Sequence, residues 1–272
     1  MAALNVRSVL VTGSNRGIGL ELIKQLVGKR NRPEWIFATC RDPEGPHAQV
    51  LKNLADKHQE VKIVRLDTSD PSGVKAAAAR ITEQLKGAGL NLLINNAGIV
   101  KPTSLETETP EYMSEVYQTN VIGPMVVSQA FLPLLRKASQ ESPQKGMSCS
   151  KAAIVNVSSE AGSITNLLAW DEGQVISYRC SKAALNILSK CQSLGFAKDG
   201  ILSIALHPGW VQTEMTSPDE CFRYQRGVCS QPKMSPGPGE SDPQFPDESS
   251  WDYRSSQGTD RQPKDPDRKL IP

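Results

Sequence analysis

The sequence predicts an α/β fold in which one doubly wound parallel sheet carries helices on both faces. Two observations lead to this prediction. Short runs rich in Val and Ile alternate with longer amphipathic stretches, the pattern of parallel strands joined by crossover helices. A glycine-rich turn also links the first of these runs directly to the first amphipathic stretch, as expected where a strand of such a sheet passes into a helix.

Strands are predicted where short runs are almost continuously apolar, as expected for strands that are buried on both faces. In chain order these runs are 8–11, 35–39, 62–65, 90–95, 152–157 and 202–206. Helices are predicted where apolar residues recur with helical periodicity. These stretches are 17–27, 48–55, 72–85, 112–135 and 178–196. Ligands of such a sheet bind beyond the carboxyl ends of the strands, and the motifs described below fall at those ends.

Residues 1–215 are expected to form this domain, because the composition changes beyond them. Residues 216–272 hold nine of the 19 prolines of the chain but only three Val, Leu or Ile residues. So little apolar surface cannot offset the entropy that is lost when a segment becomes ordered. The segment 216–272 is therefore predicted to be a disordered, Pro-rich tail.

The overall composition excludes several classes of partner. Lys and Arg number 31 against 29 for Asp and Glu, so no general positive field attracts nucleic acid. No apolar stretch approaches the roughly 18 to 20 residues that span a bilayer, and the N-terminus lacks the pattern of a secretory signal. The six cysteines are scattered without metal-ligand spacing. We therefore expect a reduced, cytoplasmic protein without a metal site, a membrane segment or a nucleic-acid partner.

The turn after the first predicted strand has the sequence TGSNRGIG. Its glycines allow the backbone to approach a pyrophosphate closely, and the helix that follows presents free N–H groups and the positive end of its dipole. We therefore predict that this turn binds a dinucleotide. The residues concerned are Gly13, Ser14, Asn15, Arg16, Gly17, Ile18 and Gly19.

The second predicted strand ends where the cofactor's 2′ position is expected, about 20 residues beyond the glycines. An acidic residue there favours NAD, but this chain has Cys40 and Arg41. The guanidinium of Arg41, flanked by Arg16, can pair with a 2′-phosphate, which favours NADP(H). Asp42 leaves NAD open. Asp67, after the third strand, is expected either to accept from an adenine amino group or to cap the next helix.

The fourth predicted strand ends in Asn95, Asn96, Ala97 and Gly98. The small residues of this turn allow close contact with a cofactor, so Asn96, Ala97 and Gly98 are predicted to bind it. The amide of Asn95 is expected to tie neighbouring strand ends together.

Tyr178 and Lys182 form the candidate catalytic pair, with Ser158 and Ser159 following the fifth strand. Residues four apart share one face of a helix, so the phenol and the ammonium can project into the same cleft. A neighbouring cation is expected to lower the pKa of the phenol. Tyr178 can then exchange a proton with a carbonyl or alcohol oxygen while hydride moves at the adjacent carbon, and a serine hydroxyl can hold that oxygen.

Taken together, these motifs resemble the short-chain dehydrogenase/reductase family over roughly residues 9–213, which implies a Rossmann-type fold and a nicotinamide cofactor. TGSNRGIG resembles the family's cofactor turn, NNAG its structural and cofactor-binding motif, and YRCSK its Tyr-x-x-x-Lys motif. The resemblance implies that Asn120 supports a proton relay through a held water and Lys182. It also assigns the catalytic serine to Ser159, with Ser158 as the less favoured candidate.

The resemblance extends to HPGWVQTEM, which is similar to the family's turn after the sixth strand. It implies cofactor contacts from Pro208, Gly209, Val211 and Thr213, with Thr213 at the nicotinamide carboxamide. Within the family, the sequence is most similar to the carbonyl reductase, sniffer and C-factor group, which implies NADPH-dependent reduction of a small-molecule carbonyl substrate. The segment 160–177 is expected to form part of the substrate-site wall.

The Pro-rich tail stands where this family has its substrate-lid helices and a seventh strand, so the final strand and the lid are predicted to be missing. This departure leaves open a second hypothesis, a catalytically silent or unstable variant that binds a dinucleotide or a protein partner. A homodimer is possible. Any dimer contact that the family makes through the missing elements would be lost.

Overall fold

The computed structural model describes residues 5–167, 170–171, 173–209, 211 and 213. These residues belong to one of the two units into which the chain divides. The predicted tail, final strand and lid lie outside the described residues, so those expectations stay predictions. Among the described residues, no helix combines the length and hydropathy that crossing a bilayer requires.

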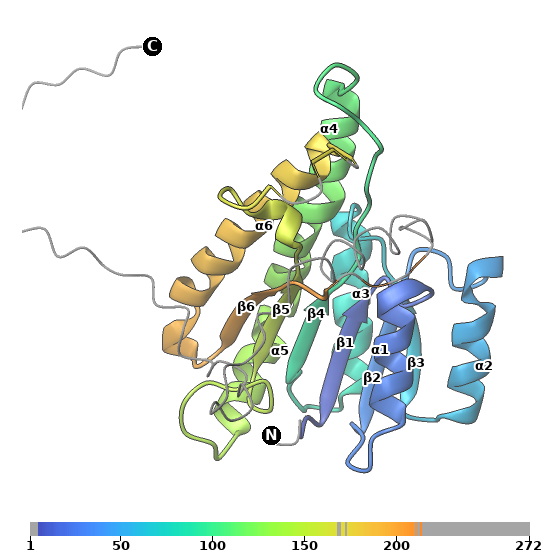
Figure 1. Ribbon diagram of the computed structural model, residues 1–272. Helices are drawn as coiled ribbons and strands as arrows, with labels where there is room; N and C mark the ends of the chain where they lie inside the picture. The colour runs from blue at the N-terminus through green and yellow to red at the C-terminus, as the bar shows by residue number, and fades with distance from the viewer. Residues whose placement is uncertain (1–4, 168–169, 172, 210, 212, 214–272) are drawn as a thin grey trace, which may run out of the picture. The chain divides into compact units, whose positions relative to one another are not determined.

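Six parallel strands form a single sheet in the order β3-β2-β1-β4-β5-β6 (Figure 1). The strands are β1 (Ser8–Thr12), β2 (Trp35–Cys40), β3 (Val61–Arg65), β4 (Leu92–Asn95), β5 (Ala153–Val157) and β6 (Leu202–Leu206). Val11 of β1 lies opposite Ala38 of β2 on one side and Ile94 of β4 on the other. The strand order therefore reverses direction at β1, where an open α/β sheet leaves a crevice for a ligand.

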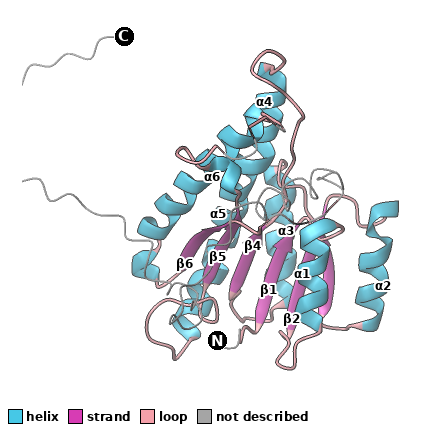
Figure 2. Ribbon diagram, in the orientation of Figure 1, coloured by secondary structure: helices cyan, strands magenta, loops and turns pink. Residues whose placement is uncertain are grey.

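Helices cover both faces of this sheet (Figure 2), which confirms the predicted fold class. They are α1 (Gly17–Val27), α2 (Gln49–Lys57), α3 (Pro71–Gln84), α4 (Pro110–Tyr117), α5 (Gly123–Glu141) and α6 (Ile176–Gly195). Short 3-10 segments lie at Pro46–Ala48, Glu160–Gly162 and Ala197–Asp199, and a π-helical segment lies at Gln118–Ile122.

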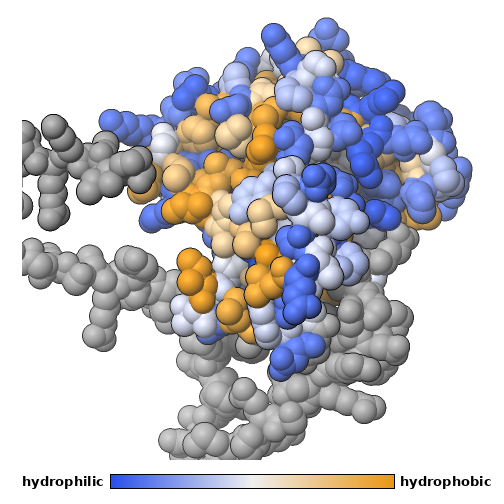
Figure 3. Space-filling view, turned by 90° about the horizontal axis from the view of Figure 1, so that it is seen from above, coloured by the Kyte–Doolittle hydropathy of each residue, from blue (hydrophilic) through white to orange (hydrophobic). Residues whose placement is uncertain are grey.

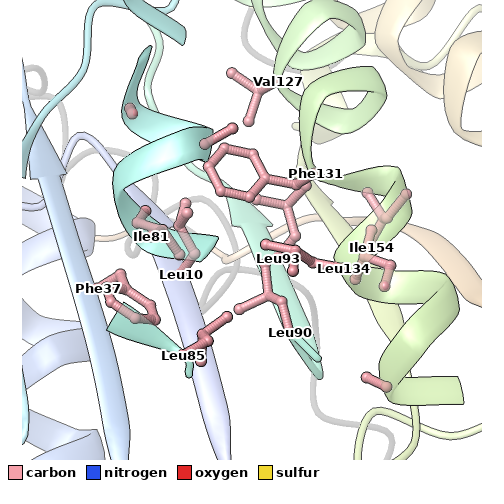
Figure 4. Packing of buried hydrophobic residues seen from close by; sticks show 14 of the residues in the cluster. Leu10, Phe37, Ile81, Leu85, Leu90, Leu93, Val127, Phe131, Leu134 and Ile154 are labelled. Carbon is pink, nitrogen blue, oxygen red and sulfur yellow. The ribbon is translucent and has the colours of Figure 1, made fainter. Parts of the chain in front are cut away.

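Two apolar clusters, one on each face, hold these layers together. On one face, Phe131 of α5 and Ile81 of α3 pack with Leu10, Leu93 and other strand residues (Figure 4). On the other face, strand residues of opposite parity, such as Val9 and Val11, pack against α1 and α2. Successive strand residues thus point into different cores, which is why each strand is almost continuously apolar.

The helix predicted over 112–135 is present but is divided, because a π-helical segment separates α4 from α5. Pro124 has no amide hydrogen to donate to the carbonyl of Asn120, four residues before it. The backbone widens at this point, as π-helical turns do. Apolar periodicity does not reveal such a turn, because the apolar residues continue on both sides of it.

The other predicted elements are present, with boundaries that shift by one or two residues. One of the two-residue shifts is in β4, which begins at Leu92 rather than Leu90. The amide of Leu90 donates to the carbonyl of Leu134 in α5, at 3.0 Å, instead of to a neighbouring strand. The position of a strand end thus depends on a contact between elements.

Candidate active site

A cavity of about 440 Å³ opens at the carboxyl ends of the central strands. Viewed from this side, hydrophobic side chains gather at the centre and left of the molecule, whereas hydrophilic ones dominate on the right (Figure 3). Most residues predicted to bind cofactor line the cavity. They are Gly13, Asn15, Arg16, Gly17, Ile18, Arg41, Asp67, Asn96, Ala97, Gly98, Tyr178, Lys182, Pro208 and Thr213.

The glycine turn is held in place by the turn after β4. Gly13 and Gly17 have φ angles of 65° and 53°, which favour glycine because a Cβ is strained in this left-handed region. The Asn96 side-chain amide donates to the carbonyls of Thr12 and Gly13, at 2.9 and 3.2 Å. The Thr12 hydroxyl in turn accepts from the Asn96 and Ala97 amides, both at 3.0 Å. These bonds shape one continuous wall of the cavity.

Ser14 and Gly19 do not line the cavity, and their predicted cofactor contacts stay predictions. Ser14 is fully buried and its hydroxyl donates to the Val11 carbonyl at 2.6 Å. A Cβ on Gly19 would lie 2.2 Å from the carbonyl oxygen of Gly13, so this glycine is required for close packing of α1 on the turn. Both residues therefore stabilise the conformation of the turn and do not form part of the cavity lining.

Two residues of the turn after β6 also stand outside the cavity lining. Gly209 and Val211 are exposed, whereas their neighbours Pro208 and Thr213 line the cavity. A Cβ on Gly17 would lie 3.6 Å from Cγ2 of Thr213, so the turn after β6 approaches the glycine turn closely. The predicted cofactor contacts of Gly209 and Val211 stay predictions.

Among the charged residues after β2 and β3, Arg41 and Asp67 line the cavity but Asp42 does not. The Asp42 carboxylate turns into its own loop, where it accepts from the Glu44 amide at 3.1 Å. The helix-capping role considered for Asp67 is wrong, because Asp70 caps α3 by accepting from the Ser72 amide at 3.0 Å. Asp67 accepts from the Ser69 amide at 2.9 Å within the loop beyond β3.

The structure distinguishes the two serines that follow β5. Hydrogen bonding by Ser159 acts to lower the pKa of the Tyr178 phenol, and the Ser159 Oγ accepts from the Ala161 amide at 3.1 Å. Ser158 is buried, and its hydroxyl donates to Oδ1 of Asn186 at 2.6 Å. Ser159 is therefore the serine whose side chain meets Tyr178, although it is Ser158 that lines the cavity.

Lys182 lies one helical turn beyond Tyr178 on α6, and the two side chains meet as the spacing predicts. Its Nζ lies 5.4 Å from the centre of the Tyr178 ring and donates to the Val157 carbonyl at 2.8 Å. Only 5% of Lys182 is exposed. Burial lowers the pKa of this ammonium from 10.5 to about 8.

The expectation that a cation lowers the pKa of Tyr178 is wrong for this structure. Burial raises the pKa of the phenol, and the hydrogen bond with Ser159 opposes this only in part. The Lys182 ammonium lies over the ring and bonds to the Val157 carbonyl. Tyr178 therefore carries its proton at neutral pH.

Asn120 lies in the π-helical segment and fixes the loop after β4. Its side-chain amide accepts from the Ile99 amide and donates to the Ile99 carbonyl, both at 2.9 Å, and it also donates to the Ser181 hydroxyl at 3.0 Å. A Cβ on Gly98 would lie 3.3 Å from Oδ1 of Asn120 and 3.8 Å from Nζ of Lys182. The predicted relay partners Asn120 and Lys182 thus both lie close to Gly98.

Comparison with known proteins identifies the family. A sequence model described as "short chain dehydrogenase" matches residues 7–221. The chain belongs to the short-chain dehydrogenase family. This confirms the family that the motifs indicated.

Solved structures place this short-chain dehydrogenase near the carbonyl reductases. NADPH-bound carbonyl reductase from chicken fatty liver is 60% identical, with a TM-score of 0.78, over 79% of this chain and 80% of that one. Carbonyl reductase Sniffer of D. melanogaster is 36% identical, with a TM-score of 0.74, over 79% and 85%. An uncharacterized oxidoreductase of Schizosaccharomyces pombe is 33% identical over 80% of this chain and 78% of its own length.

Sequence reasoning missed several cavity-lining residues of this short-chain dehydrogenase. Most of them directly follow a strand or a recognised motif, so their position at a carboxyl end was the available signal. They are Cys40, Leu66, Thr68, Ser69, Ile99, Val100, Thr119 and Val157. Within the described part of the chain, no three His, Cys, Asp or Glu side chains cluster closely enough to hold a metal ion.

Proposed function

We propose that this short-chain dehydrogenase reduces a small-molecule carbonyl compound, with NADPH as the hydride donor and Tyr178 as the proton donor. The observation that carries the proposal is the arrangement at Tyr178. A mostly buried phenol, protonated at neutral pH, is hydrogen-bonded to Ser159, and the Lys182 ammonium lies over its ring. The chicken liver enzyme, with 60% identity and bound NADPH, supports the same interpretation.

The cavity fits a dinucleotide phosphate. The glycine turn opens α1 at one end of the cavity, where free amide N–H groups can bind a pyrophosphate. Arg16 and Arg41 line the same cavity, and both are exposed. Because the Asp42 carboxylate turns into its own loop, it does not oppose a 2′-phosphate from the cavity wall. These contacts favour NADP(H) over NAD.

Each group near Tyr178 has a distinct part in the proposed reaction. When bound, NADPH supplies the hydride. The Ser159 hydroxyl orients the carbonyl oxygen, and Tyr178 donates its proton to that oxygen as negative charge develops there. Asn120 holds the loop that carries Ile99 and Val100 along the cavity wall, and we propose that it also supports reprotonation of Tyr178 through Lys182.

The silent-variant hypothesis gains no support from this arrangement, because Ser159, Tyr178 and Lys182 come together as a working site requires. The cytoplasmic location, the homodimer and the role of 160–177 as a substrate-site wall stay predictions.

Replacement of Tyr178 by Phe tests the proposal, because it removes the proton donor and keeps the ring. We expect kcat with a panel of aldehydes and ketones to fall by about 100-fold or more, the usual range for loss of a general acid. The Kd for NADPH should stay within about twofold, because the hydride donor's phosphates bind elsewhere in the cavity. Tyr112→Phe is the matched control, since Tyr112 is 43% exposed on α4. Wild-type turnover in Tyr178→Phe would contradict the mechanism.

A further inference from the structure

The catalytic helix α6 begins without a local side-chain cap. Its N-cap residue, Val175, has a φ of 39° and no side chain that can accept a hydrogen bond. The first amides of a helix need acceptors, and capping side chains usually supply them. Here the Ser177 amide donates to Oε2 of Glu108 at 2.8 Å, across 69 residues of sequence. A distant carboxylate therefore caps the helix one residue before Tyr178.

Both carboxylate oxygens of Glu108 accept hydrogen bonds. Oε2 also accepts from the Thr103 hydroxyl at 2.6 Å, and Oε1 accepts from the Thr109 amide at 3.2 Å. An ionised carboxylate suits these three donors, because it accepts only. Burial acts to raise the pKa of Glu108, but the hydrogen bonds from Thr103, Ser177 and Thr109 outweigh it and leave the pKa below its usual value. Glu108 therefore stays ionised at neutral pH.

A second bond joins the same two parts of the chain. The Leu105 amide donates to Oε1 of Gln174 at 2.8 Å. The segment 99–109 is thus attached to 173–177 at two points, and α4 and the start of α6 lie together at the top of Figure 1. This segment begins at Ile99 and Val100, which line the cavity. The segment that is bonded to the start of α6 is thus continuous with this part of the cavity wall.

We propose that Glu108 is a positioning residue for carbonyl reduction, which holds the segment 99–109 against the start of α6 so that the cavity wall and the Tyr178 phenol keep a fixed separation. This inference rests on the proposed function. It assigns Glu108 no contact with the substrate or with NADPH, because Glu108 does not line the cavity.

Glu108→Gln tests the inference, because the amide keeps the size of the side chain but presents an NH2 group to donors. We expect kcat/KM for the carbonyl substrate to fall about tenfold, the loss of about 1.4 kcal/mol expected for one hydrogen bond to a charged group. The Kd for NADPH should stay within about twofold, because the glycine turn is not touched. Hydrogen exchange at the Ser177 amide should become about tenfold faster.

The matched control is Glu106→Gln, which makes the same charge change at an exposed position of the same segment. It should leave kinetics and exchange unchanged. If Glu108→Gln does not fold, Thr103→Val removes one donor to the same carboxylate and should lower kcat/KM in the same direction, by about threefold. Faster exchange at Ser177 with wild-type kcat/KM would overturn the positioning role. Absence of carbonyl reduction in the wild type would instead overturn the proposed function.

Discussion

Replacing Lys182 by Met should change how the stability of the ligand-free protein depends on pH. The folded protein lowers the pKa of this ammonium from 10.5 to about 8 because burial disfavours its charge. Each unit between the unfolded and folded pKa values corresponds to about 1.4 kcal/mol, so the charged lysine costs the folded state about 3 kcal/mol at neutral pH. A methionine side chain at this position would keep most of the volume without the charge, at the loss of the bond to the Val157 carbonyl.

The sign of the effect follows from proton binding. Between pH 8 and 10.5 the unfolded chain holds the lysine proton more tightly than the folded protein does, so this group makes the protein more stable as pH rises. Below pH 8 its full cost is present. The free energy of unfolding of Lys182→Met minus that of the wild type should therefore be larger at pH 7 than at pH 10, by about 2 kcal/mol.

Urea denaturation of both proteins at several pH values between 7 and 10 measures this difference. Taking the difference removes the contribution of the other titrating groups, which the two proteins share. Lys190→Met, at an exposed position of the same helix, is the control and should give a curve parallel to the wild type. Parallel curves for Lys182→Met and the wild type would refute the argument. The variant should also lose carbonyl reduction, because it lacks the ammonium that is proposed to reprotonate Tyr178. The lysine thus lowers the stability of the folded protein but is needed for function.

Three further substitutions test the cofactor site and the core. Arg41→Ala should raise the Kd for NADPH by about tenfold or more and leave the Kd for NADH unchanged, since a charged contact to a phosphate contributes about 1.5 to 3 kcal/mol; equal affinities of the wild type for both cofactors would contradict the NADP(H) preference. Gly19→Ala should weaken NADPH binding and lower the free energy of unfolding by about 1 to 3 kcal/mol, because its Cβ would meet the Gly13 carbonyl at 2.2 Å; an unchanged urea midpoint would argue against that packing. Phe131→Ala should lower the free energy of unfolding by about 3 to 5 kcal/mol, because the ring is fully buried between α3 and the sheet; a loss below about 1 kcal/mol in urea denaturation would show that the core closes around the gap.

The sequence predicted those features of the site that depend on neighbouring residues. The glycine turn follows a strand and opens a helix, so its position at the sheet edge could be inferred without a structure. The spacing of Tyr178 and Lys182 placed both on one face of a helix, and the structure has Nζ 5.4 Å from the ring centre. Asn95 was expected to tie strand ends, and its side chain donates to Oδ1 of Asn156 on β5 at 2.8 Å.

The features that sequence reasoning missed depend on burial and on contacts between distant segments. The raised pKa of Tyr178 follows from its burial, which the helix spacing alone does not reveal. The preference for Ser159 over Ser158 was implied only by the family resemblance, and the physical reason for it lies in how the loop after β5 meets α6.

The alternating apolar pattern and the motifs at strand ends therefore determined the sheet, its helices and the family of this protein, because both are local properties of the chain. The tertiary structure decided which of the candidate groups meet. It turned Asp42 away from the cavity, placed Asn120 in a π-helical segment against Ile99, and brought Glu108 to the start of α6. Such contacts form between residues far apart in the sequence, so no local pattern encodes them, and they exist only once the sheet and its helices have packed.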